Sequence, residues 1–257
     1  METSRNKAAP PLVLCLGLPG SASTWVYNIC IYLCGLRQPF LVSMGYSDDS
    51  ADFLAKIGDA DESSAALVLK SHYADAGMRD YVSANYSKCV LSIRDPRDCI
   101  VSLMERFRQS FEAALINVKA SCDAVMRFRR PDVPLLRYED RFFVSQQTLS
   151  LLQRYLAPAE RIDPAVLAQR YSREAVTEFI GTFGQLEPGR MVIHGCDVSD
   201  AVTHWHRNHF GDGLSGKWRT RLAFEQKAQA NRALAAALLA FGYGNGDTPA
   251  TRNGPPS

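Results

Sequence analysis

The chain has 257 residues, of which 46% are hydrophobic and 22% are charged. This length and composition are ordinary for a globular protein with a sizeable core, and one large domain is expected. The formal net charge is only +2, so the whole protein carries no field that would gather nucleic acid. Any anion site must therefore be local.

Cysteine usage indicates the compartment. The seven cysteines are odd in number, lie mostly among apolar neighbours and include no Cys-x-x-Cys pair. This usage predicts a reduced, cytoplasmic protein. Lys7 and the apolar run 11–18 imitate a signal peptide, but removing that run would destroy the first motif described below. No segment reaches the roughly 18 apolar residues of a membrane span.

Four short apolar runs are continuous rather than alternating in polarity, which is typical of buried parallel strands. They cover residues 12–18, 66–69, 89–93 and 133–137. Helical patterns lie between them, beginning with residues 23–36. The sequence therefore predicts an α/β fold, with a parallel sheet covered by helices on both faces. Ligand-binding residues should directly follow the strands.

The remaining segments complete the expected organisation. The segment 43–64 is polar and acidic, which predicts a loop around a short helix with a solvated acidic face. Residues 222–239 are Ala-rich and amphipathic, as a C-terminal helix would be. We expect a flexible N-terminus at 1–10, one domain at 11–242 and a flexible tail at 243–257.

The first candidate site follows the first predicted strand. Residues 18–25 read Leu-Pro-Gly-Ser-Ala-Ser-Thr-Trp, a turn of small and hydroxyl residues that opens a helix. The free backbone N–H groups and the positive dipole end of such a helix would hold a phosphate. For this stretch alone a plain helix cap is an equal alternative, and no Lys-Ser/Thr pair completes a Walker loop.

The second candidate site follows the strand predicted at 89–93. Arg94 stands at its end, Asp95-Pro96-Arg97-Asp98 comes next, and Ser102 lies on the following predicted helix. The fork of an Arg and the hydroxyl of a Ser both suit a phosphate. The structural alternative is that these charged side chains pair with one another at the surface.

The two motifs resemble those of the sulfotransferases that use 3′-phosphoadenosine 5′-phosphosulfate (PAPS), whose first loop reads Pro-Lys-Ser-Gly-Thr-Thr-Trp and whose third strand ends Arg-(Asn/Asp)-Pro-(Lys/Arg)-Asp. Residues 136–140, Leu-Arg-Tyr-Glu-Asp, are similar to the family's Tyr-Glu-Asp strand end. Residues 213–219, Gly-Leu-Ser-Gly-Lys-Trp-Arg, are similar to its late Gly-x-x-Gly-x-Trp lid. The resemblance implies a single domain with the P-loop-NTPase-like sulfotransferase fold.

The resemblance also implies which residues bind the donor. The first-loop residues would hold the 5′-phosphosulfate: Gly20, Ser21, Ala22, Ser23, Thr24 and Trp25. Arg94 and Ser102 would hold the 3′-phosphate. The late lid would approach that phosphate with Gly213, Ser215, Gly216, Lys217 and Trp218. The product would be adenosine 3′,5′-bisphosphate (PAP), and no metal would be required.

Lys70-Ser71-His72 resembles the family's Lys-Thr-His strand end. The resemblance implies that His72 takes the proton of the acceptor hydroxyl and that Lys70 steadies negative charge. Histidine suits such a transfer near neutral pH. The chain departs from the family at Gly20, where many members have Lys, so positive charge must come from elsewhere. Candidates are Lys70, Lys217, Arg219 and Arg221.

The expected function is therefore sulfuryl transfer to a hydroxyl of a small-molecule, glycan or lipid acceptor. Gly20 motivates one alternative, a nucleotide-binding relative that has lost catalysis. The strand-loop-helix start permits a second, a P-loop kinase, which the missing Gly-Lys-Ser/Thr ending disfavours. The cluster of His204, His206 and His209 raises the alternative of a metal site, although a loop facing the acceptor is the favoured interpretation. Neither nucleic acid nor a membrane is an expected partner, and the oligomeric state stays open.

Overall fold

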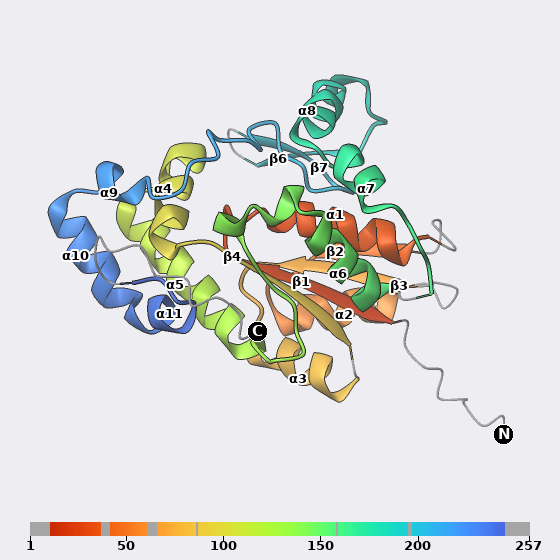
Figure 1. Cartoon of the computed structure of the whole chain (residues 1–257), viewed down its shortest axis with the longest axis horizontal. Coiled ribbons are helices and arrows are strands. Elements are labelled where there is room, and N and C mark those ends of the chain that lie inside the picture. Colours follow the sequence, from red (N-terminus) through yellow and green to blue (C-terminus); the bar gives the residue numbers. More distant parts are fainter. Residues whose placement is uncertain are drawn as a thin grey trace.

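The centre of the molecule is a five-stranded parallel sheet with the strand order β2-β3-β1-β4-β5 (Figure 1). The structure, a computed structural model, describes residues 11–36, 42–60, 66–85, 87–157, 159–194 and 197–244. The strands are β1 (Leu12–Gly17), β2 (Val42–Tyr46), β3 (Ala66–Ser71), β4 (Lys88–Ile93) and β5 (Leu135–Arg137). The predicted α/β fold with a parallel sheet is thus confirmed.

Helices cover the sheet and extend to one side of it (Figure 1). They are α1 (Ser23–Cys34), α2 (Ser50–Asp59), α3 (Ala76–Ala84), α4 (Pro96–Phe107), α5 (Phe111–Phe128), α6 (Gln146–Leu156), α7 (Pro164–Arg170), α8 (Arg173–Gly181), α9 (Trp218–Arg221), α10 (Phe224–Ala233) and α11 (Ala235–Ala240). An antiparallel hairpin of β6 (Met191–His194) and β7 (Asp197–Asp200) lies beside α7 and α8 in this view.

Two hydrophobic cores lie on opposite faces of the sheet, because successive side chains of a strand point to opposite sides. Leu14 and Leu16 of β1 pack with residues of α3, α4, α5, α10 and α11. Val13 and Cys15 pack with residues of α1, α6, α7 and α8. All residues of β1 and β3 are buried. Both faces are therefore occupied, and the carboxyl ends of the strands remain for binding.

The segment 43–64 differs from the sequence prediction, because it begins with an edge strand rather than a loop. β2 pairs in parallel with β3, with Met44 opposite Val68 and Tyr46 opposite Lys70. The short helix predicted there is α2, and the side chain of Asp49 caps it. The strand was missed because Ser43 and Gly45 interrupt its apolar pattern. Its stability comes from pairing with β3, which the local sequence does not show.

The predicted C-terminal helix is divided into α10 and α11, which both pack against α5. Tyr243 lies beyond the predicted domain end at residue 242, yet it packs against the core and donates its hydroxyl to Glu139 Oε2 at 2.7 Å. The predicted flexible segment 1–10 falls outside the described residues, and so does the predicted tail 243–257 except for residues 243 and 244. Within the described ranges, no helix combines the length and apolarity needed to cross a bilayer.

Candidate active site

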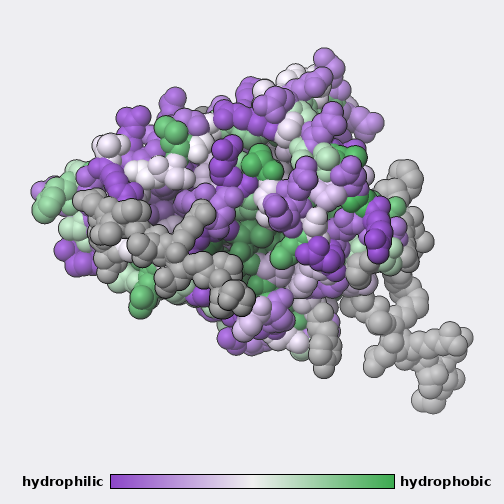
Figure 2. All heavy atoms as spheres, viewed as in Figure 1, coloured by the Kyte–Doolittle hydropathy of each residue, from purple (hydrophilic) through white to green (hydrophobic). Residues whose placement is uncertain are grey.

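A cavity of about 1140 Å³ lies where the carboxyl ends of β1, β3 and β4 meet, as expected for an open parallel sheet. Figure 2 shows a largely hydrophilic face with hydrophobic side chains gathered toward its middle. Most of the residues predicted from the sequence line this cavity: Gly20, Ala22, Ser23, Thr24, Trp25, Lys70, His72, Arg94, Ser102, Gly213, Ser215 and Lys217. Segments almost 200 residues apart in the chain thus meet here.

The first loop presents mainly backbone to the cavity. Gly20 and Ala22 have φ angles of 78° and 61°, and such left-handed turns bring successive amides to one side. No side chain caps the N-terminus of α1, so the first amides of this helix have no capping acceptor in the described part of the chain. Unsatisfied amides at a helix N-terminus form an anion site.

Ser21 does not line the cavity, although the resemblance implied that it contacts the 5′-phosphosulfate of PAPS. Its side chain is fully buried, and Oγ donates to the carbonyl oxygen of Leu18 at 2.7 Å. The same hydroxyl lies 2.9 Å from Ser92 Oγ at the end of β4. Ser21 therefore fixes the loop to the sheet, and its hydroxyl has no direct access to a ligand in the cavity.

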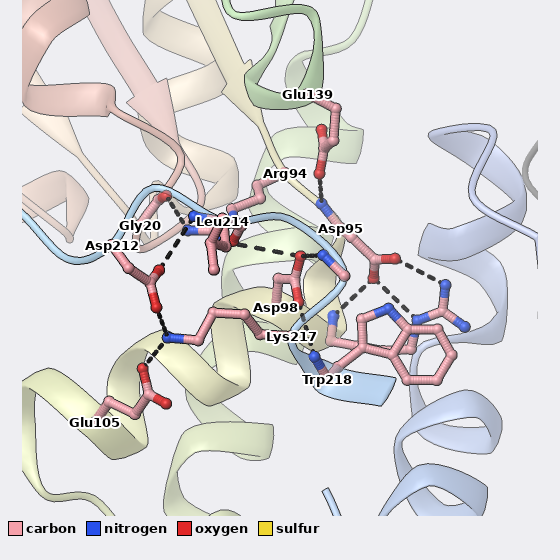
Figure 3. A network of polar contacts seen from close by, with 12 residues as sticks. Gly20, Arg94, Asp95, Asp98, Glu105, Glu139, Asp212, Leu214, Lys217 and Trp218 are labelled. Carbon is pink, nitrogen blue, oxygen red and sulfur yellow. Dashed lines mark hydrogen bonds and ion pairs between the residues drawn. The ribbon is translucent and has the colours of Figure 1, made fainter. Parts of the chain in front are cut away.

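Arg94 extends from the end of β4 between the first loop and the late lid (Figure 3). Its Nη1 donates to Gly20 O at 3.1 Å and its Nη2 donates to Leu214 O at 2.7 Å. The guanidinium lies over the Tyr138 ring at 4.4 Å. Its buried Nε has no acceptor among the described residues. A buried cation with a free donor, whose short hydrogen bonds are to neutral carbonyls, favours an incoming anion.

Asp98 fastens the late lid to the start of α4. Its Oδ2 accepts from Gly216 N at 2.5 Å, and its Oδ1 accepts from Trp218 N at 3.0 Å (Figure 3). Burial raises the pKa of this carboxyl against the effect of those two amides. Neither Gly216 nor Trp218 lines the cavity. In this structure they position the lid, whereas Gly213, Ser215 and Lys217 of the lid line the cavity.

The pairing expected by the structural alternative for the second motif is present, but both ion pairs are buried rather than at the surface. Arg97 pairs with Asp95 through Nε at 2.9 Å and Nη2 at 2.8 Å, and it stacks on the Trp218 ring at 3.7 Å. This pair is buried and turned away from the cavity. Arg94 Nη2 forms a longer ion pair with Asp98 Oδ2 at 4.0 Å, and Arg94 also lines the cavity with its Nε unsatisfied. The motif thus combines a structural ion pair with one cation directed at the cavity.

His72 and Lys70 meet at the end of β3. His72 Nδ1 lies 2.5 Å from Gly17 O, and a carbonyl can only accept, so Nδ1 carries the proton. His72 Nε2 is then an unprotonated acceptor, 3.4 Å from Lys70 Nζ. Burial and the charge of Lys70 lower the pKa of His72 to about 3. Burial also lowers the pKa of Lys70 to about 8.

Asp48 organises this strand end, although the sequence placed its charge on a solvated face. Its Oδ1 accepts from Ser71 Oγ at 3.0 Å, from His72 N at 3.1 Å and from Tyr73 N at 3.2 Å. Its Oδ2 accepts from the Tyr46 hydroxyl at 2.6 Å. The carboxylate thereby holds the turn after β3 in place. Its position directly after the missed strand β2 was the signal that could have identified it.

Comparison with solved structures identifies the fold. The chain is similar to mouse sulfotransferase SULT7A1 complexed with PAP, with a TM-score of 0.59 and 13% identity over 92% of this chain and 90% of that chain. It is also similar to retinol dehydratase in a complex with retinol and PAP, with a TM-score of 0.54 and 16% identity over 91% and 83% of the two chains. The chain has the sulfotransferase fold. No family model and no curated protein matches the sequence.

Arg106 is a cavity residue of this sulfotransferase fold that the sequence analysis did not select. It lies on α4 one turn after Ser102, and its Nε donates to Asn208 O at 3.1 Å. Its charge adds to burial in lowering the pKa of His72 and of Lys70, so it lies near both. A helical spacing of four residues from Ser102 was the signal available in the sequence.

The histidine cluster lies in the segment that precedes the lid, on the same cavity of the sulfotransferase fold. This segment is irregular: His204 has a φ of 54°, and His206 Nδ1 lies 3.0 Å from Asp197 Oδ2. Among the described residues, no three His, Cys, Asp or Glu side chains form a group that could hold a metal ion. Cys196, considered as a further ligand, lies outside the described residues.

Acid should destabilise this protein through its buried histidines. Burial is the main cause that lowers the pKa of His72, of His206 and of His209 below 6.5, the value expected in the unfolded chain. Between that value and the lowered pKa the unfolded chain binds more protons, so the free energy of unfolding decreases as the pH falls. Melting temperatures measured from pH 7.5 to 4.5 should decline below about pH 6.5. The decline should be shallower in His209→Gln, and a flat profile in the parent protein would contradict this cause.

Proposed function

We propose that this protein transfers a sulfuryl group from PAPS to a hydroxyl group of an acceptor molecule. The observation that carries this proposal is the meeting of His72, Lys70 and Arg94 with the amide-rich first loop at one cavity. The similar protein retinol dehydratase has been solved with retinol and PAP, and with androsterone and PAP. These ligands support an acceptor that carries a hydroxyl group.

The chain's own residues fit the donor's anionic groups. The uncapped N-terminus of α1 offers amides for the 5′-phosphosulfate, and Ala22, Ser23 and Thr24 line the cavity there. Arg94 offers an unsatisfied Nε, and Ser102 offers a hydroxyl on the neighbouring helix face for the 3′-phosphate. Gly213, with a φ of 76°, lets the lid backbone approach the same region.

In the proposed reaction the donor supplies the sulfuryl group and a phosphate leaving group. The tautomer that Gly17 O fixes leaves His72 Nε2 able to accept the proton of the acceptor hydroxyl. Lys70 is 4% exposed, so its ammonium would act on the transferred group through little screening water. Asp48 keeps both groups in position by holding the backbone of residues 72 and 73.

Two alternatives share the cavity and are separated by ligand preference. A nucleotide-binding relative without catalysis would bind PAP and transfer nothing from PAPS. A P-loop kinase would need a Lys at the end of the first loop for the β- and γ-phosphates, and no Gly-Lys-Ser/Thr sequence closes residues 18–25. The retained Lys70 and His72 favour catalysis over binding alone.

PAP should raise the melting temperature of the protein, while ATP with magnesium should raise it far less. A ligand that binds only the folded state stabilises it by about 2.7 kcal/mol at 100 times its Kd. Differential scanning fluorimetry at matched nucleotide concentrations measures both shifts. The opposite order would favour a kinase.

A screen of hydroxyl compounds with sulfur-labelled PAPS then separates the enzyme from the inactive relative. Small-molecule, glycan and lipid acceptors should all be included. Labelled product with any of these compounds supports the proposed transfer. Binding of PAP without transfer to any member of a broad panel, and without transfer to water, would favour the relative that has lost catalysis.

A further inference from the structure

The first loop has no room for a cation at residue 20. A Cβ atom on Gly20 would lie 2.8 Å from Ser102 Oγ and 3.2 Å from Ser102 Cβ. The φ of 78° also disfavours any residue with a side chain. The loop therefore contributes only neutral amides to the transferred end of the donor, and a full positive charge must come from another element.

Helix α4 places a cation beside this loop. Asp98, Ser102 and Arg106 are spaced by four residues, so they share one face of the helix. Ser102 on this face lies against Gly20. Arg106, one turn further, lines the cavity, and its bond to Asn208 O fixes the guanidinium between α4 and the segment before the lid.

Arg106 also acts on the groups expected to take part in transfer. Burial is the main cause of the lowered pKa values of Lys70, His72 and His209, and the positive charge of Arg106 adds to it in all three. All four side chains line the same cavity, which Lys70 enters from β3 and Arg106 enters from α4.

Two carboxylates offset part of these charges: Asp48 raises the pKa of Lys70 against the effect of burial, and Asp197 does the same for Arg106. Neither Lys70 nor Arg106 forms a direct ion pair within the described ranges, and three acids in or beside the cavity contact other groups. Asp98 accepts from the lid amides, Glu105 pairs with Lys217, and Asp197 lies 3.0 Å from His206 Nδ1. Two cations that line one cavity without a direct ion pair favour an anion in that cavity.

We propose that Arg106 stabilises the sulfuryl group during transfer with a positive charge. This charge would replace that of the first-loop Lys, whose position Gly20 occupies in this chain. This inference rests on the proposed function. During transfer the acceptor oxygen bonds to sulfur, and the bond from sulfur to the bridging oxygen of the 5′-phosphate breaks. That oxygen keeps the electron pair, and His72 receives the acceptor's proton. Because Nε of Arg106 is bonded to Asn208 O, its Nη groups are the donors for the sulfuryl oxygens.

Arg106→Ala should reduce kcat by about 10² to 10³, the usual effect of removing one donor that stabilises developing charge. Calorimetry should show weaker binding of PAPS, and PAP, which lacks the sulfuryl group, should bind within about threefold of the parent protein. Arg106→Lys should regain part of the turnover because it keeps the charge. Millimolar guanidinium chloride should restore part of the turnover of Arg106→Ala, which a purely structural role would not allow.

Two controls separate this inference from the proposed function. Arg79→Ala removes an exposed arginine that pairs with Asp80 and should leave every value unchanged. Gly20→Lys should not raise turnover, because Ser102 occupies the space of its side chain.

Parent-like turnover in Arg106→Ala, or equal losses of affinity for PAP and PAPS, would overturn the role of Arg106 alone. If Arg106→Ala fails to fold, the affinities of Arg106→Lys for PAPS and PAP test the proposal instead. A larger loss for PAPS than for PAP supports it, and equal losses contradict it. A parent protein that neither binds PAP nor transfers sulfuryl would overturn the function itself.

Discussion

His72→Ala is expected to reduce kcat by about 10² to 10⁴, the range for loss of a general base. The affinity for PAP should change little, because Nε2 of His72 lies beside Lys70 and, in the proposed mechanism, contacts the acceptor rather than the donor. A loss in kcat with an unchanged donor affinity is typical of a group that acts in the transition state. Steady-state kinetics with a screened acceptor and calorimetry with PAP measure the two quantities.

The control for this substitution is His72→Asn, which can keep a hydrogen bond to Gly17 O but cannot accept a proton at the position of Nε2. It should be as inactive as His72→Ala. Lys70→Ala should also slow transfer, but with weaker donor binding, because the loop lacks its own cation. Near-normal turnover in a folded His72→Ala protein would contradict the mechanism. His206, which faces Asp197, would then be the first alternative base to test.

Arg94→Ala should weaken PAP binding by about 10², because two charge-assisted bonds of roughly 1.5 kcal/mol or more each are lost. Adenosine 5′-monophosphate, which lacks the 3′-phosphate, should lose much less affinity. The two affinities are measured by calorimetry on the parent protein and the variant. If binding of both nucleotides is weakened equally, Arg94 does not contact the 3′-phosphate.

Arg94→Lys is the matched variant for this test, since it keeps the charge and loses the fork. In the structure one fork spans Gly20 O and Leu214 O, and a single ammonium has a different geometry. We therefore expect an intermediate affinity for PAP. Melting temperatures of both variants without nucleotide show whether the link between loop and lid matters for folding as well as for binding.

Much of the sheet could be predicted from the sequence because its central strands are buried on both faces. The runs at 12–18, 66–69 and 89–93 are continuously apolar, and they correspond to β1, β3 and β4. The edge strand β2 was not predicted, because Ser43 and Gly45 are tolerated only through its pairing with β3. The local hydrophobic pattern predicts which strands are buried, but it does not predict which strand from elsewhere in the chain will pair with them.

The same distinction holds in the candidate site. Residues that directly follow strands, such as Lys70 and Arg94, could be selected because strand ends converge. Whether a side chain turns toward the cavity could not be predicted, and Ser21 turns away to meet Ser92. For Asp48 and Arg106 the sequence offers only a position after a strand and a helical spacing from Ser102, and their contribution depends on tertiary distances between β2, β3 and α4 that neither signal gives.

The bond from Arg94 Nη2 to Leu214 O joins residues 120 positions apart, and Gly20 O meets the same guanidinium from 74 positions before it. Glu139, which accepts from Asp95 N at 2.8 Å, is in turn held by Tyr243 near the end of the described chain. The proposed nucleotide site is therefore built from contacts of high sequence separation, which form slowly because long loops must close first. During synthesis on the ribosome, a growing chain exposes its first loop and Arg94 long before the lid emerges. The nascent protein can acquire this site only after the lid and Tyr243 have been translated.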